Sequence, residues 1–189
     1  MKKEVQDCFL SALRDEAKGK KHKGLFLIHA DNKRAVEFLA KAKLNLELCD
    51  MYKEKGFDYK IPEEWFYTLY YCALAILSRF GVESRSQRCT ASFLRYIQAQ
   101  GLIEYDDEFI DRITVHSSKG KISDVDERET ARYSSAIKSQ DVTSRYAPMT
   151  LTCKRAISQC EEIVFSNKEF TVPRDLFPLE KLRGLGKDL

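Results

Sequence analysis

The residues best suited to hold a phosphate group include two arginines in the second half of the chain. Arg128 and Arg132 lie four residues apart, and Tyr133 follows directly. At that spacing two guanidinium groups share one face of a helix, where a bound phosphate would offset their mutual repulsion. The alternative is a solvated, ion-paired cluster, because three carboxylates are close in sequence: Asp126, Glu127 and Glu129.

A second basic group stands at the expected start of an earlier helix. Arg85 and Arg88 flank Gln87 there, and the free backbone N–H groups of a helix N-terminus favour anions. Gln87 can donate a hydrogen bond but cannot carry a proton at neutral pH. Tyr70 and Tyr71 precede this group, and they would either stack on a nucleobase or pack in the core.

Proton-transfer chemistry has few candidates in this sequence, which has three histidines. Arg112 and His116 are four residues apart, but the β-branched residues between them favour a loop. Glycine-rich nucleotide-binding motifs, nucleophile elbows and zinc-ligand spacings are all missing from the sequence. We therefore expect neither a cofactor nor a metal.

Composition predicts a globular, cytoplasmic protein with no membrane segment. The 189 residues carry a formal charge of +3, with 8 Gly and 4 Pro, which excludes collagen-like and wholly disordered chains. The longest uncharged run, residues 65–78, is too short to span a bilayer, and no secretory signal is evident. The six cysteines form no Cys-x-x-Cys pair, so we expect reduced, buried thiols.

Hydrophobic periodicity predicts an all-α, up-and-down bundle of four to five helices, preceded by a short amphipathic helix over residues 1–17. The basic stretch 18–24 is expected as a loop that is either solvated or binds phosphate. No strand is expected. Helices are predicted at 32–55, 62–80, 86–100, 105–112, 124–139 and, after Pro148, to about 166.

Cap residues and apolar positions set these boundaries. Asp31 or Asn32 begins the helix at 32–55, whose buried positions are expected to be Val36, Leu39, Ala42, Leu46 and Cys49. Pro62 opens the next helix, which is apolar around most of its circumference and is therefore predicted to be central. We expect an N-terminal helix and basic loop over residues 1–31, the helical domain over 32–166, and over 167–189 a tail that packs loosely or only in an assembly.

Several motifs, in order, resemble those of the HEPN domain family of small prokaryotic proteins. Tyr70-Tyr71-Cys72-Ala73 is similar to that family's Tyr-Tyr-Ala helix, and Gly81-Val82 to its Gly-hydrophobic turn. Arg128-Glu-Thr-Ala131-Arg132-Tyr133 resembles Arg-x-x-Ala-Asp-Tyr, with Arg132 in place of the acidic residue. Ser86-Gln87 stands where the family has Ser/Thr-His. The resemblance covers roughly residues 32–166.

The resemblance implies a dimeric helical bundle, and in many members a metal-independent ribonuclease paired with a nucleotidyltransferase antitoxin. Such enzymes carry Arg and His separated by four to six residues. Here the matching positions after Arg128 are Tyr133, Ser134 and Ser135, so whether the chain is an enzyme stays open. If it cleaves RNA, Arg128 and Tyr133 are the expected catalytic residues, because a guanidinium stabilises phosphate charge.

Three functions follow as alternatives. The first is a HEPN-like endoribonuclease toxin of a toxin–antitoxin or defence system. The second is a non-catalytic HEPN module that binds RNA, nucleotide or a nucleotidyltransferase partner. The third is a helical assembly subunit that docks through residues 167–189. In the first two the chain is expected to be a homodimer, and the residues expected to bind RNA or phosphate are Tyr70, Arg85, Gln87, Arg88 and Arg132.

Overall fold

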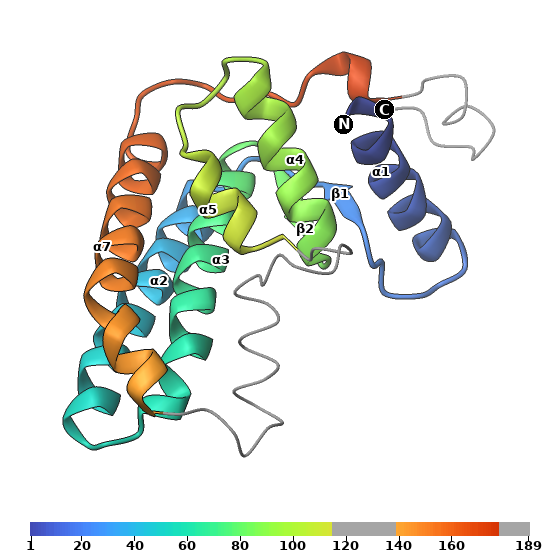
Figure 1. The fold of residues 1–189 in the computed structure, drawn as a ribbon. Helices are drawn as coiled ribbons and strands as arrows, with labels where there is room; N and C mark the ends of the chain where they lie inside the picture. Colours follow the sequence, from blue (N-terminus) through green and yellow to red (C-terminus); the bar gives the residue numbers. More distant parts are fainter. Residues whose placement is uncertain (115–138, 178–189) are drawn as a thin grey trace.

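The computed structural model of the chain describes residues 1–114 and 139–177, with the side chains of 139–141 excepted. The described part is mainly helical, as predicted, with one small sheet (Figure 1). Its elements, in order, are α1 (Lys2–Ala17), β1 (Leu25–Leu27), α2 (Asn32–Glu54), the 3-10 turn η1 (Asp58–Lys60), α3 (Ile61–Arg79), β2 (Val82–Ser84), α4 (Gln87–Ala99), α5 (Asp107–Arg112), α7 (Ser139–Val164) and the 3-10 turn η2 (Arg174–Leu176). No described helix is both long enough and apolar enough to cross a bilayer.

Helix α3 is central, as its composition predicts. It contacts α2, α7, α4 and α5, and α2, α3 and α7 lie side by side (Figure 1). Pro62 occupies its first turn, where a missing N–H costs no helical hydrogen bond. Trp65, Phe66 and Leu69 are almost completely buried along it. An apolar helix of this kind is stable when its neighbours cover most of its surface, and here Tyr67 and Tyr71 stay partly exposed.

Helix α2 begins where its cap predicts but turns a slightly different face inward. Asp31 is the N-cap, and its carboxylate accepts a hydrogen bond from the backbone N–H of Arg34 at 2.9 Å. Ala35 is fully buried, whereas Val36 is 41 % exposed, so the expectation of a buried Val36 is wrong. The closely packed α2–α3 pair accepts the smaller side chain and leaves the β-branched one in solvent.

A short antiparallel sheet corrects the prediction that the chain has no strands. Leu25, Phe26 and Leu27 pair with Ser84, Glu83 and Val82, respectively. Three residues per strand are too few for an alternation of polar and apolar residues to be recognised, and the two strands are far apart in sequence. The sheet joins the loop after α1 to the turn after α3.

Helix α1 packs on α4 and β1 with the predicted apolar face, since Val5, Phe9 and Ala12 are buried. The structure corrects the expectation for the cysteines here, because Cys8 of α1 and Cys89 of α4 form a disulfide. The other four cysteines form no disulfide and are buried, as predicted. Pairing of two residues 81 apart depends on the packing of α1 on α4, which spacing alone does not reveal.

Two further expectations about the C-terminal part are wrong. Helix α7 begins at Ser139 and continues through Pro148 rather than starting after it, because Tyr146 and Met149 are buried on either side of the proline. The first part of the predicted loose tail is packed: Leu176 is fully buried, and the ring of Phe177 lies 5.3 Å from that of Phe9. Residues 178–189 lie outside the described residues.

Candidate phosphate and nucleobase site

Three predicted site residues lie outside the described residues. Arg128, Arg132 and Tyr133 all fall in the segment 115–138, as does His116. Arg112, the other half of the Arg112–His116 spacing, lies in α5 and pairs with Glu108 at 3.0 Å. The candidate site is therefore built from Tyr70, Arg85, Gln87 and Arg88 and from the side chains beside them.

Arg85, Gln87 and Arg88 stand at the start of α4, as predicted. Ser86 is its N-cap and accepts a hydrogen bond from the backbone N–H of Cys89. Arg85 and Arg88 are exposed and Gln87 is partly exposed. This arrangement leaves two cationic side chains in solvent near the positive end of a 13-residue helix, which favours anions.

Glu83 holds Arg85 beside a second arginine that the sequence analysis did not single out. Its carboxylate accepts hydrogen bonds from Arg34 at 3.2 Å and from His22 Nε2 at 3.2 Å, and pairs with Arg85 Nε at 2.8 Å. Burial alone would raise the pKa of Glu83, but these three partners outweigh it and hold the pKa below its ordinary value. Each guanidinium keeps further N–H donors for a ligand, because it has five.

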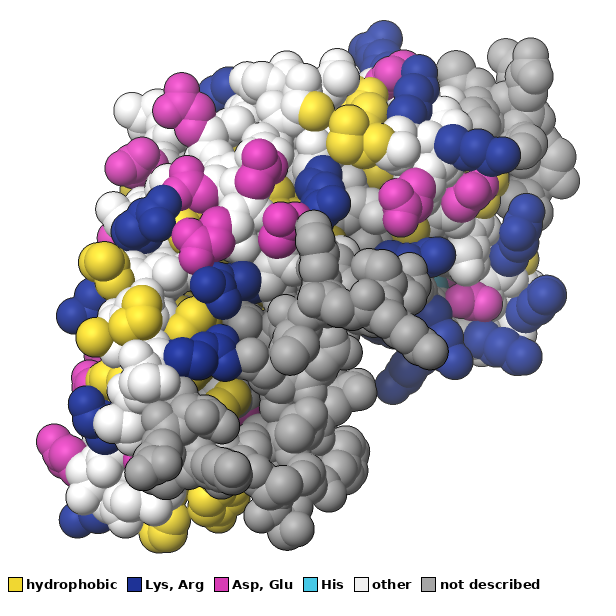
Figure 2. All heavy atoms as spheres, viewed as in Figure 1, with side chains coloured by type: hydrophobic (Ala, Val, Ile, Leu, Met, Phe, Trp, Pro, Cys, Tyr) yellow, Lys and Arg dark blue, Asp and Glu magenta, His cyan; other side chains and the backbone are white. Residues whose placement is uncertain are grey.

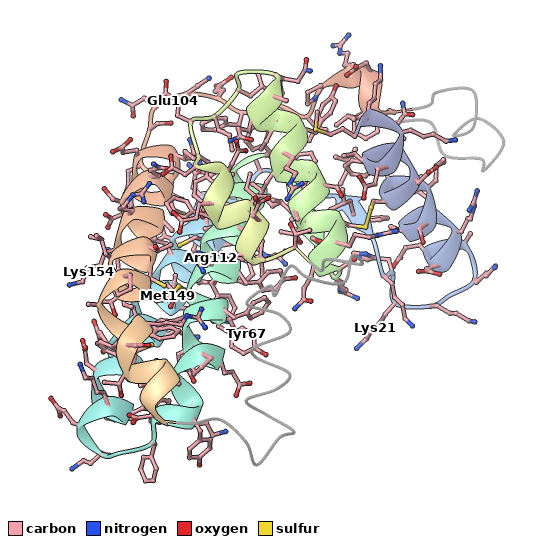
Figure 3. All side chains as sticks on the ribbon, in the orientation of Figure 1. Lys21, Tyr67, Glu104, Arg112, Met149 and Lys154 are labelled. Carbon is pink, nitrogen blue, oxygen red and sulfur yellow. A yellow bond between two sulfur atoms is a disulfide. The ribbon has the colours of Figure 1, made fainter. Side chains whose placement is uncertain are left out.

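The basic loop 18–24 is only partly the solvated segment that its composition suggests. Lys21 projects away from the body of the protein, and Lys and Arg side chains gather over α1 and this loop (Figures 2 and 3). His22 instead is 4 % exposed and stacks on Phe26, with ring centroids 5.4 Å apart. Because the His22 side chain points into the protein, it makes one of the three contacts to Glu83.

Aromatic rings and cations continue from Arg34 along the α2–α3 surface. The Phe38 and Tyr71 rings stack at 6.0 Å, and Tyr67 stacks on Tyr71 at 5.8 Å. Lys41 Nζ lies 5.6 Å from the Phe38 centroid and 5.7 Å from that of Tyr71, and the Arg34 guanidinium lies 5.6 Å from Phe38. We call Arg34, Phe38, Lys41, Tyr67, Tyr71 and Arg85 the basic–aromatic face.

The basic–aromatic face contains a shallow hollow of about 310 Å³ at its α2 end, lined by Asp31, Arg34, Glu37, Phe38 and Lys41. Tyr67 projects from α3 on the side away from α7 (Figure 3). Two same-face patterns could have identified this surface from sequence: residues 34, 38 and 41 on α2, and 67 and 71 on α3.

Tyr70 occupies a different part of α3 from the basic–aromatic face. Its ring stacks on Phe66 at 5.6 Å and is partly buried. Along the helix it lies nine residues before Arg79, or roughly 14 Å from the helix end that leads to Arg85. Tyr71, its neighbour in sequence, is the ring that lies beside Lys41.

Within residues 1–114 and 139–177, no group of three or more His, Cys, Asp or Glu side chains is arranged to hold a metal ion.

Comparison with family models, curated proteins and solved structures gives no match for the chain. The resemblance to HEPN domains therefore stays a prediction from the motifs.

Proposed function

We propose that the chain is a HEPN-like protein that binds single-stranded RNA or nucleotide through the basic–aromatic face. The observation that carries the proposal is the placement of Arg34 and Lys41 beside a stack of partly exposed aromatic rings, with Arg85 and Arg34 held on the same carboxylate, that of Glu83. Single-stranded nucleic acid is bound by this pairing of elements, in which cations follow the phosphates and rings stack on bases.

The geometry favours a single strand over a duplex. Phe38 of α2 and Tyr71 of α3 stack on one another, and Lys41 lies within 6 Å of both rings. Bases in a duplex are already stacked on one another and cannot reach protein rings without unpairing. Glu37 and Asp31 line the same hollow, so binding is expected to be moderate and to weaken steeply with salt.

Following the resemblance, the proposal includes a homodimer and a nucleotidyltransferase-type partner. Cleavage of the bound RNA, through Arg128 and Tyr133, is the catalytic form of the same proposal. The two forms separate when purified protein is incubated with RNA in the presence of EDTA. Cleavage that is lost in Arg128→Ala indicates the ribonuclease, and binding without cleavage indicates the non-catalytic module.

The test of the binding face is fluorescence anisotropy of a labelled single-stranded RNA over a salt series. Lys41→Gln is expected to reduce the slope of log K against log salt by about 0.7, the value for one phosphate contact on a single strand. The control is Lys154→Gln, because Lys154 is an exposed lysine of α7 remote from this face (Figure 3). Both variants remove one positive charge.

The aromatic contribution is tested with two substitutions of one residue. Tyr71→Ala is expected to weaken RNA binding by about 1–3 kcal/mol, the usual value of one base stacked on one ring. Tyr71→Phe keeps the ring and is expected to bind as the wild type does. If Tyr71→Ala, Lys41→Gln and Lys154→Gln all bind RNA with the wild-type affinity and slope, the basic–aromatic face is not the binding surface.

A further inference from the structure

A second, larger hollow lies between the N-terminus of α2, the C-terminus of α3 and the segment after α7. Its volume is about 710 Å³, within the range of small-molecule sites. Its lining includes Asp31, Asn32, Arg79, Lys168 and Glu169. Asp31 lines both this hollow and the smaller one beside Arg34.

Arg79 is the residue that suggests a ligand. It is 8 % exposed, and its guanidinium donates to Asn32 Oδ1 and, at 2.9 Å each, to the backbone carbonyls of Ser166 and Lys168. All three acceptors are neutral, and the buried Nε–H has no partner. A buried cation is ordinarily paired with an anion, and within the described residues no carboxylate forms an ion pair with Arg79.

The end of α2 that faces this hollow adds positive potential. Its first turn has no acidic residue and instead carries Lys33 and Arg34, although acidic residues are preferred there. Asp31 caps only the N–H of Arg34, and the first N–H groups of a helix have no partner within the helix. Asn32, which begins the helix, is exposed and also binds Arg79.

We propose that this hollow is a binding site for a phosphate monoester, with the phosphate group in the hollow against Arg79 and the first turn of α2. A guanidinium and helix N–H groups offer several hydrogen-bond donors at once. The three or four oxygens of a phosphate can use more of these donors than the two oxygens of a carboxylate can. Asp31 and Glu169, which also line the hollow, would accept hydrogen bonds from hydroxyl groups of the esterified part. This inference goes beyond the proposed RNA binding and does not depend on it.

The deciding variant is Asn32→Asp, which keeps the oxygen that Arg79 binds and supplies the missing negative charge. A carboxylate at the start of α2 is also favourable to the helix, so this variant is expected to fold. The matched control is Asn45→Asp, which makes the same change of charge in the same helix, 13 residues or about 20 Å further along.

The measurement is the thermal unfolding midpoint as inorganic phosphate is added at constant ionic strength, with chloride as the reference anion. Wild type and Asn45→Asp are expected to gain stability with rising phosphate, and Asn32→Asp to lose at least tenfold in apparent affinity. A nucleoside monophosphate and glycerol phosphate, compared in the same assay, identify the esterified part. The proposal is wrong if phosphate raises the wild-type midpoint no more than chloride, or if the two variants respond alike.

This test is independent of the RNA experiments. Lys41→Gln and Tyr71→Phe leave the hollow beside Arg79 unchanged and are expected to respond to phosphate as the wild type does. An unphosphorylated RNA oligonucleotide is expected to bind equally well with saturating phosphate present once ionic strength is matched. A failure of either site therefore leaves the other proposal to be judged on its own result.

Discussion

The disulfide between Cys8 and Cys89 is expected to be a large contributor to stability. The two residues are 81 positions apart, and the chain-entropy relation for closing a loop of that length gives about 4.5 kcal/mol. The folded state should survive the loss of the cross-link, because α1 is also anchored by apolar contact. The Phe9 ring lies 6.4 Å from that of Phe93 and 5.3 Å from that of Phe177.

The perturbation is the double substitution of Cys8 and Cys89 by alanine, compared with oxidised and reduced wild-type protein. Urea unfolding can be followed by fluorescence of Trp65, the single tryptophan, which is buried in α3. We expect oxidised wild type to be more stable than the double variant by about 4.5 kcal/mol. Reduced wild type should resemble the variant, and reductant should leave the variant unchanged.

Counting thiols gives an independent check on the same bond. Denatured in the absence of reductant, the chain should titrate four thiols, and after reduction all six. Six thiols in the unreduced protein, together with identical urea midpoints for oxidised and reduced samples, would refute the cross-link. In that case the sequence-based expectation of reduced cysteines would hold for all of them.

Two more predictions concern the surroundings of the sheet. The pKa of Glu83 is lowered in the folded state, so its ion pairs stabilise the fold above the unfolded value of about 4.3 and lose this effect as the pH falls through the folded pKa. Glu83→Gln should therefore lower the urea midpoint at neutral pH and make the midpoint fall less as the solution is acidified. If the midpoint of the variant follows that of the wild type at every pH, the ion pairs of Glu83 do not stabilise the fold. Gly24→Ala should destabilise the fold by about 1–3 kcal/mol in the same assay, because its Cβ would lie 2.2 Å from the carbonyl oxygen of Cys8.

The helices were predictable because their ends are marked by local chemistry. Asp31, one of the two predicted caps, caps α2, Pro62 stands in the first turn of α3 as predicted, and α4 begins directly after its cap Ser86, close to the predicted start. These signals act within one turn of the chain and do not depend on distant residues. At Pro148 the prediction from local sequence is wrong, because the helix continues through the proline. Packing of the buried flanking residues outweighs the helix-breaking tendency of proline.

The candidate sites were less predictable because they depend on contacts between distant segments. Phe38 and Tyr71 are 33 positions apart and meet only because α2 packs along α3. From the sequence, Arg79 is indistinguishable from any basic residue in the last turn of a helix, here α3. Its burial follows from the chain after α7, which passes over it and presents the carbonyls of Ser166 and Lys168.

Both proposed sites depend on how the turn after α3 meets the chain before α2. The N–H of Ile28 donates to the carbonyl of Gly81, and the N–H of Asp31 to that of Ser78, which fixes the N-terminus of α2 beside the C-terminus of α3. Gly81 has a φ of +67°, and a Cβ there would lie 2.6 Å from the Ile28 carbonyl oxygen. Only glycine allows this approach without strain. It brings the positive end of α2 next to Arg79, so the turn at Gly81 creates the electrostatic setting that an anion would use.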